Sequence, residues 1–242
     1  MTAGGAHTCL RLGGNGQCWG ASKRYQVQFS QKDALTPHTY KFNDLLSLVA
    51  GYNNTCAIRG KGDLSCWGDN VEGQLANGKK GFYESTNTPQ KVMLPDIVDK
   101  VVIGSGFICA LLDAEKVMCW GDGDVGKLGN GSSTSTQSPV WVSSVSSATD
   151  VDVGLDHGCV VMLSGQVWCW GRAVEGQLGT DPKQGNPMKT VKVPGLKDVT
   201  AIATGDVHSC ALRKDGSVLC WGEGKNGALG NGSFATSHVP VQ

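Results

Sequence analysis

The chain has 242 residues and balances 21 basic side chains against 21 acidic ones. A nucleic-acid surface needs a basic excess and an anionic membrane attracts polybasic segments, so this even balance speaks against both partners. The apolar runs are far shorter than a membrane span, and we therefore expect no membrane insertion.

The first residues, MTAGGAHTC, already match later parts of the chain, so we expect no signal peptide or anchor among them. We therefore expect one of two situations. The chain is cytosolic, or a leader or neighbouring domain has been removed from it, which would make it a fragment or subunit of a larger assembly.

A short hairpin with two cysteines recurs five times along the chain and uses all ten cysteines. Its first cysteines are 47, 53, 50 and 51 residues apart, and a period of that length is typical of repeat architectures. A glycine stands five residues before each first cysteine, and Trp-Gly follows each second cysteine. Copies 2 to 5 then carry a Gly-x-Leu element, whereas copy 1 reads ASKRYQVQFSQ at that place. The paired cysteines are Cys9 and Cys18, Cys56 and Cys66, Cys109 and Cys119, Cys159 and Cys169, and Cys210 and Cys220.

Each copy predicts four short strands. One precedes the hairpin, as in VDKVVIG; two form the hairpin; and one surrounds a Pro-x-Val element, as in TPQKV. In the last hairpin Cys210 should face Cys220 and Leu212 should face Val218, with a turn at Lys-Asp-Gly. Both faces of such a sheet are apolar, so both must be covered.

Sheets stacked around an axis cover one another, which favours a β-propeller over an open β-solenoid with exposed end sheets. We predict an all-β propeller of five four-stranded blades in a single domain, residues 1–242. The end SHVPVQ matches a fourth strand and the start matches a strand before a hairpin, so we expect the two terminal strands to share one blade. The repeats are approximately 1–48, 49–101, 102–151, 152–202 and 203–242.

The pattern Gly-x-x-His-x-Cys-Ala-Leu, Asp-Gly-x-Val, Cys-Trp-Gly, Gly-Gln-Leu-Gly resembles the repeats of the regulator of chromosome condensation family. The resemblance covers essentially the whole chain and implies a β-propeller, usually of seven blades in that family. The cysteine-paired form is similar to repeats of secreted or surface bacterial proteins. Members of the family include an exchange factor for a small GTPase, a photoreceptor and an enzyme inhibitor, so fold alone does not select the function.

Residues opposite each other on antiparallel strands are about 4.5–5.5 Å apart, which a disulfide tolerates. The even count and constant spacing favour five disulfides within the hairpins and an oxidising compartment. We therefore expect an extracellular or cell-surface protein, with the periplasm as a further possibility. Two alternatives remain open: reduced cysteines that pack as small apolar side chains, and zinc, for which the spacing is poor.

No residues form the arrangement of nucleophile, base and orienting group that catalysis requires, so we expect no enzyme and no cofactor. The stretch Gly121–Lys127 resembles a phosphate-binding loop, but Leu128 stands where a Ser or Thr would hold magnesium. Asp122 and Asp124 resemble part of a calcium loop that lacks its terminal glutamate. Three histidines share one repeat position and are expected to be framework residues: His7, His157 and His208.

Loop positions that differ between copies are free to specialise, so we expect the partner to touch the loops before the first cysteine and after Trp-Gly. The predicted function is a non-catalytic binding module for a protein or glycan partner, as adhesin, inhibitor or structural subunit. The resemblance implies an alternative, an intracellular regulator that exchanges the nucleotide of a small GTPase. The candidate contact residues are Tyr52, Asn53, Phe107, Ile108, Asp156, Asp206, Val207, Tyr25 and Arg172.

Overall fold

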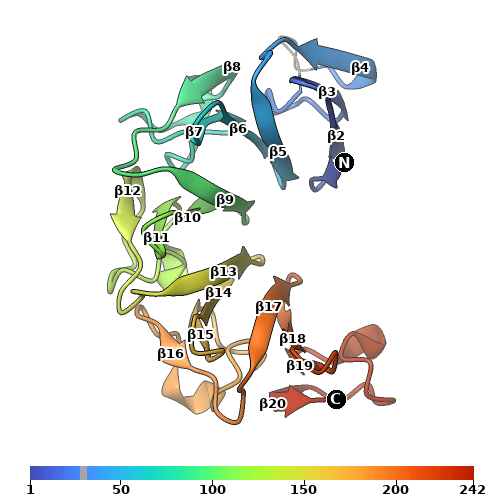
Figure 1. Ribbon diagram of the computed structural model, residues 1–242, viewed down its shortest axis with the longest axis vertical. Coiled ribbons are helices and arrows are strands. Elements are labelled where there is room, and N and C mark those ends of the chain that lie inside the picture. The colour runs from blue at the N-terminus through green and yellow to red at the C-terminus, as the bar shows by residue number, and fades with distance from the viewer. Residues whose placement is uncertain (28–31) are drawn as a thin grey trace. The chain divides into compact units, whose positions relative to one another are not determined.

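The computed structural model describes residues 1–27 and 32–242 and contains five four-stranded antiparallel sheets (Figure 1). The predicted all-β class and the five four-stranded blades are therefore confirmed. Each sheet uses four consecutive strands, and in each the strand before the hairpin lies at one edge. We call that strand the inner strand.

The strands of the five sheets have the following bounds. The first sheet contains β1 (Thr2–Ala3), β2 (His7–Leu12), β3 (Asn15–Gly20) and β4 (Ala34–Tyr40). The second contains β5 (Leu45–Gly51), β6 (Asn54–Arg59), β7 (Asp63–Gly68) and β8 (Thr86–Lys91). The third contains β9 (Val98–Ile103), β10 (Phe107–Leu112), β11 (Lys116–Gly121) and β12 (Thr136–Trp141). The fourth contains β13 (Ala148–Val153), β14 (His157–Met162), β15 (Val167–Gly171) and β16 (Val191–Lys192), and the fifth contains β17 (Val199–Thr204), β18 (His208–Arg213), β19 (Val218–Gly222) and β20 (Ser237–Val241).

The helical content of the described residues is confined to short 3-10 turns in the loops that follow β7, β11, β15 and β19. These turns are η1 (Phe82–Glu84), η2 (Asp124–Gly126), η3 (Pro182–Gln184) and η4 (Lys225–Gly227). No helix among the described residues has the length and apolarity to cross a membrane.

The hairpin register agrees with the sequence. Cys210 pairs with Cys220 and Leu212 pairs with Val218, as the alternation of apolar residues requires. In four of the hairpins the disulfide-bonded cysteines have Cα atoms 4.1 Å apart. Cys109 and Cys119 are also disulfide-bonded, and no described cysteine is free.

The expectation that the two terminal strands share one blade is wrong. β1 pairs with β2, through Thr2 opposite Cys9, and so supplies the inner strand of the first sheet itself. β20 pairs with β19, through Val241 opposite Cys220, and completes the fifth sheet. β1 is joined to β2 by the short loop 4–6, and β20 follows β19 after the longer loop 223–236, so each terminal strand pairs with a strand of its own hairpin.

Contacts divide the chain into two compact units. Unit 1 consists of Met1–Asp113, Trp120–Asp122 and Ser135–Pro139, and unit 2 consists of Ala114–Cys119, Gly123–Thr134 and Val140–Gln242. The first two sheets lie in unit 1 and the last two in unit 2. The single-domain assignment remains a prediction.

Within each unit neighbouring sheets cover each other's apolar faces, as predicted. In unit 1 Trp67 of the second sheet is fully buried against Tyr40 and Phe42, with ring centroids 4.7 and 6.2 Å away. In unit 2 Trp221 of the fifth sheet packs in one cluster with the fourth-sheet residues Val161 and Val167. The apolar core therefore lies between consecutive sheets and is rebuilt at each repeat.

Candidate functional site

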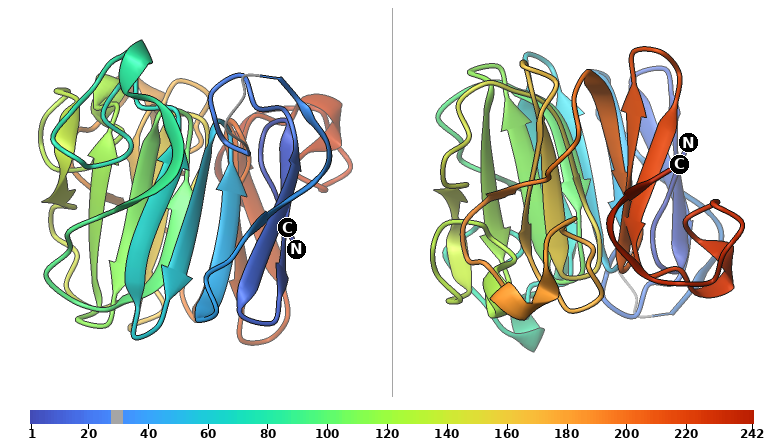
Figure 2. Two further views of the ribbon diagram at one scale, coloured as in Figure 1. Left: turned by 90° about the horizontal axis from the view of Figure 1, so that it is seen from above. Right: turned by 90° about the horizontal axis from the view of Figure 1, so that it is seen from below.

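Both loop sets singled out from the sequence lie at one end of each sheet, which we call the loop end (Figure 2). The backbone N–H of Asp69, after Trp-Gly in the second sheet, donates to the carbonyl of Asn53, before the first cysteine. Arg172 donates in the same way to Asp156 in the fourth sheet. The glycine of Trp-Gly has a φ of +114° at Gly68 and +97° at Gly171, a backbone shape that favours glycine and turns the chain into the loop.

The loop end is fixed to the next sheet by tryptophan. Each buried indole N–H donates to a backbone carbonyl in the loop of the preceding sheet, at 2.7–3.1 Å. A hydrogen-bonded, fully buried indole both fills the core and satisfies a loop carbonyl. The pairs are Trp67 with Gln26, Trp120 with Gln74, Trp170 with Lys127, and Trp221 with Gln177.

The glutamine that offers this carbonyl also orders its own loop. The side chain of Gln74 accepts from the backbone N–H of Glu72 at 2.9 Å, and that of Gln26 accepts from Arg24 at the same distance. Copy 1 thus has the element that its sequence seemed to lack. Tyr25 occupies the place of the glycine in Gly-x-Leu and adopts a φ of +62°. A non-glycine residue with a positive φ is strained and must be held in place by its surroundings. Tyr25, one of the predicted contact residues, is therefore part of the framework of this loop.

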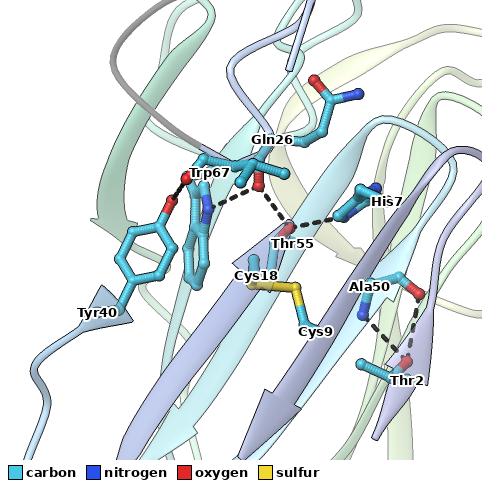
Figure 3. The surroundings of a disulfide bond; sticks show 10 residues. Thr2, His7, Cys9, Cys18, Gln26, Tyr40, Ala50, Thr55 and Trp67 are labelled. Carbon is cyan, nitrogen blue, oxygen red and sulfur yellow. Dashed lines mark hydrogen bonds between the residues drawn. A yellow bond between two sulfur atoms is a disulfide. The ribbon is translucent and has the colours of Figure 1, made fainter. Parts of the chain in front are cut away.

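The shared histidine position is part of the same frame (Figure 3). His7 Nε2 lies 2.9 Å from Thr55 Oγ1 of the next sheet, and the Thr55 hydroxyl donates to the Gln26 carbonyl at 2.9 Å. Because the hydroxyl hydrogen is used by Gln26, the imidazole N–H is the donor to Thr55. His157 and Ser209 repeat the arrangement in unit 2, also at 2.9 Å.

Burial lowers the pKa of His7 to about 4 and that of His157 to about 3. Both imidazoles are therefore neutral at neutral pH and serve as hydrogen-bond donors between sheets. The expectation that the shared histidines belong to the framework agrees with this geometry for His7 and His157. Among the described residues, no group of three or more His, Cys, Asp or Glu side chains is placed to hold a metal ion.

The structure places two of the predicted contact residues in the core. Phe107 and Ile108 are fully buried, so they present no surface to a partner. Phe107 begins strand β10, and its ring fills the space that a Cβ on Gly104 would occupy, as the rings of His7, His157 and His208 do over their own glycines. The residue after it, Ile108, holds the repeat position of Thr55.

The other predicted residues of unit 1 lie at the loop end. Asn53 is exposed, whereas Tyr52 and Tyr25 are half-buried. Tyr52 also has a positive φ, +37°, so the turn before the first cysteine is tight. Asn53 is the most accessible of the three.

Two of the predicted residues of unit 2, Asp156 and Arg172, form ion pairs at the loop end. Arg172 contacts both carboxylate oxygens of Glu175, at 2.8 and 3.0 Å, and the same bonds raise the pKa of Arg172 and lower that of Glu175. Lys127, which replaces glutamine in copy 3, is buried and pairs with Asp156 at 2.8 Å. These charges neutralise one another within the loop end.

Asp206 and Val207 lie in the corresponding turn of the fifth sheet. Asp206 is exposed and Val207 is half-buried. The backbone carbonyl of Asp206 accepts from Leu155, and that of Val207 accepts from Glu223, so the backbone of this turn is held in place.

Among the described residues, the most exposed aromatic side chains of the loop end in unit 1 were not predicted from the sequence. Tyr83 is 96 % exposed and Phe82 is 48 % exposed, and their rings meet edge to face at 5.6 Å. The Arg24 guanidinium lies 5.0 Å above the Phe82 ring, and Lys79 pairs with Glu84 at 3.1 Å. We call Arg24, Lys79, Phe82, Tyr83 and Glu84 the aromatic patch.

Loop length is the signal that could have revealed this patch. Pro89 follows the Asn-Gly glycine, Gly78, by 11 residues in copy 2. The corresponding distance is eight residues in copies 3 and 5, from Gly131 to Pro139 and from Gly232 to Pro240. The three additional residues give copy 2 the room to carry η1, which contains Phe82 and Tyr83.

Two family models match the chain, and both carry the description Regulator of chromosome condensation (RCC1) repeat. The first matches residues 61–111, 116–161, 164–212 and 215–242. The second matches residues 46–74, 98–127, 148–177 and 199–228.

The chain is 35% identical to the human probable E3 ubiquitin-protein ligase HERC6 over 198 residues, which covers 77% of the chain and 19% of HERC6. It is 28% identical to the human E3 ubiquitin-protein ligase HERC2 over 246 residues, which covers 96% of the chain and 5% of HERC2. The chain therefore spans a small part of these two relatives.

Among solved structures, human WBSCR16 superimposes with a TM-score of 0.86 at 21% identity, over 98% of the chain and 65% of that protein. Yeast RCC1 (Prp20), solved with Kap60 bound, superimposes with a TM-score of 0.65 at 18% identity, over 99% of the chain and 73% of that protein. At these identities the likeness concerns the fold alone.

Proposed function

Because this chain belongs to the regulator of chromosome condensation (RCC1) repeat family, we propose that it is a non-catalytic protein-binding module that meets its partner through the loop end. The observation that carries the proposal is the aromatic patch. Two features add support: the loop-end histidines are used as framework, and yeast RCC1 has a bound protein in its solved structure. We take a protein rather than a glycan as the partner for the latter reason.

The chemistry of the patch suits a protein interface. Tyrosine, tryptophan and arginine are the residues that most often dominate binding energy, and an aromatic ring exposed as fully as Tyr83 gains most from being covered. Arg24, Lys79 and the neighbouring Lys80 add positive charge, whereas Glu84 is the acidic member of the patch. The partner surface should therefore offer an apolar recess with acidic groups around it.

The loop under the patch is ordered before any partner arrives. The Asn70 backbone N–H donates to Ser85 Oγ at 3.1 Å, and the Asn70 side chain donates to the carbonyl of Lys79 at 3.1 Å. Its side-chain oxygen also accepts from Leu75 at 2.9 Å. A loop held at both ends and in the middle loses less entropy on binding than a free one, which favours affinity.

Replacing the exposed ring tests the proposal. We expect Tyr83→Ala to weaken binding of the partner protein by about 30-fold, the effect of a residue worth about 2 kcal/mol at an interface. The partner is first recovered with the wild-type chain, and its dissociation constant is then measured with wild type, Tyr83→Ala and Met93→Ala. Met93 is exposed but lies beyond β8, away from the loop end, so its variant should bind as wild type does. Equal binding by Tyr83→Ala and wild type would remove the patch as the binding site.

We further propose that the module works in an oxidising compartment, outside the cell or at its surface. The paired, buried cysteines of the hairpins support this placement, since such bonds persist where thiols are not kept reduced. Protein from its native source should have an intact mass ten hydrogen atoms below that of the reduced chain and should take up no alkylating reagent without prior reduction. Ten alkyl groups on the unreduced protein would instead assign it to a reducing compartment.

The second candidate is a regulator of nucleotide exchange on a small GTPase, which the family resemblance implies. The same loop end would then contact the GTPase. Its test is the release rate of a fluorescent guanine nucleotide from a panel of small GTPases, with and without the chain. Acceleration that Tyr83→Ala abolishes would select this candidate, and unchanged rates across the panel would discard it.

A further inference from the structure

The fifth sheet has an apolar face that its own unit leaves uncovered. Leu212 and Val218 face each other across its hairpin and are 40 % and 48 % exposed. Their counterparts in the fourth sheet, Val161 and Val167, are fully buried. A hollow of about 310 Å³ lies over this face, lined by Ala201, Ile202, Ala203, Cys210, Ala211, Leu212 and Val218.

The contact between the fourth and fifth sheets shows what such a face accepts. The earlier sheet supplies apolar residues, a loop carbonyl on Gln177 and the imidazole of His157. The later sheet supplies the indole of Trp221 and the hydroxyl of Ser209. The first and second sheets meet in the same way, through His7, Gln26, Thr55 and Trp67.

The fifth sheet carries the accepting half of this contact. His208 stands at the position of His157, and Ala228 stands at the position of Gln177 in the Gly-x-Leu element. Both residues are at least partly exposed. The face thus combines an imidazole, a loop carbonyl and an apolar hairpin surface in the arrangement that binds a sheet elsewhere in the chain.

The first sheet carries the donating half. Trp19 and Thr8 occupy the positions of Trp221 and Ser209, and both are partly exposed. Trp19 is the one repeat tryptophan whose indole N–H makes no hydrogen bond to a described residue, whereas the other four are fully buried and bonded. A partly exposed indole donor that has no acceptor among the described residues is the complement of the face on the fifth sheet.

We propose that the fifth sheet of one copy of this chain binds the first sheet of a second copy. In the contact, the indole N–H of Trp19 donates to the carbonyl of Ala228, and the imidazole of His208 donates to the hydroxyl of Thr8. The face of the first sheet that carries Thr8 and Trp19 covers Leu212 and Val218. Each copy uses a different surface for each neighbour, so the contact is heterologous and can extend into rings or rows of copies. A second copy is the fitting occupant because the chain itself carries both halves of a contact that it already forms between its own sheets.

Two variants test the contact, and each disrupts one of the two surfaces that form it. Leu212→Lys removes the accepting face, and Thr8→Lys removes the donating face. We expect the average mass of the wild type, measured by sedimentation equilibrium, to rise with concentration, while each variant alone stays monomeric. An equimolar mixture should form a one-to-one dimer, because each variant keeps the half that the other lacks. Leu163→Lys, at an exposed turn of the fourth sheet, is the control and should assemble as the wild type does.

The mixture also shows that both variants fold, since misfolded partners would not recover a defined dimer. A wild type that is monomeric at every concentration overturns the proposal. So does a wild type that assembles while the mixture of variants stays monomeric, because the association would then use another surface. Neither result depends on the aromatic patch, so the binding function and this contact can fail separately.

Discussion

Acidification from pH 6.5 to pH 4 should lower the free energy of unfolding by about 3 kcal/mol for each of two buried histidines, His7 and His157. Burial holds their folded-state pKa values at about 4 and about 3, below the ordinary histidine value of 6.5. At pH values between the folded-state and unfolded-state pKa, the histidine binds a proton in the unfolded chain but not in the folded chain. The free energy of unfolding therefore falls as the pH falls, by about 1.4 kcal/mol per pH unit and per histidine. Urea unfolding at a series of pH values measures the effect.

The chain provides the matched variant for this experiment. Copy 2 has Asn54 at the histidine position, where its amide donates to the backbone carbonyls of Asp69 and Trp67 at 2.7 and 3.4 Å. The double variant His7→Asn, His157→Asn should be less stable at neutral pH and should lose most of the pH dependence between 6.5 and 4. His238→Asn, at an exposed position of β20, should retain it. An unchanged slope in the double variant would show that other groups cause the acid sensitivity.

Trp67→Ala should lower the free energy of unfolding of unit 1 by about 3–5 kcal/mol, the range for deleting a buried aromatic side chain. The indole is fully buried between the first and second sheets and contacts the Tyr40 ring. Without the indole N–H, the Gln26 carbonyl still accepts a hydrogen bond from the Thr55 hydroxyl. The loss of stability therefore comes chiefly from the cavity and not from an unsatisfied acceptor. Chemical unfolding followed by circular dichroism measures the change.

Trp19→Ala is the control for that variant, because it removes the same side chain from the same repeat position in the same unit. Trp19 is only partly buried and has no hydrogen bond to lose among the described residues. At concentrations where the chain is monomeric, we expect a loss of about 1 kcal/mol, typical of a substitution outside the core. Similar losses for both variants would contradict the role of the buried indole as the clamp between sheets.

Most of the fold could be predicted from the sequence because the pattern repeats. Alternation of apolar residues around Cys210 and Cys220 predicted the hairpin register, and the same alternation holds in copies 2 and 4. The terminal strands were assigned to one blade because the start of the chain was compared with a full inner strand. The structure shows that two residues, Thr2 and Ala3, are enough to pair with β2.

The site was harder to predict because a position can vary between copies for two reasons: the residue contacts a partner, or it packs against a different residue of the neighbouring copy. At Phe107 and Ile108 the variation reflects the neighbouring copy, since a sheet contact is shared by two repeats. His7 bonds to Thr55 of the next copy and His157 to Ser209, whereas the corresponding positions of copies 2 and 3 hold Asn54 and Ile108. Reading each position together with its neighbour in the next copy would have marked these residues as core. The patch at Tyr83 depends on loop length, which residue-by-residue comparison overlooks.

The hydrogen bond from each buried tryptophan indole to the preceding sheet has a consequence for how the chain folds while it is being synthesised. In every described case the indole belongs to the later sheet and the carbonyl to the earlier one. Each newly made sheet would find its acceptor already in place, and none would wait for a segment still to be synthesised. Contacts that join successive repeats allow the nascent chain to gain structure one sheet at a time from its N-terminus. The growing end would then always expose the face of the newest sheet, which is where a chaperone would be needed.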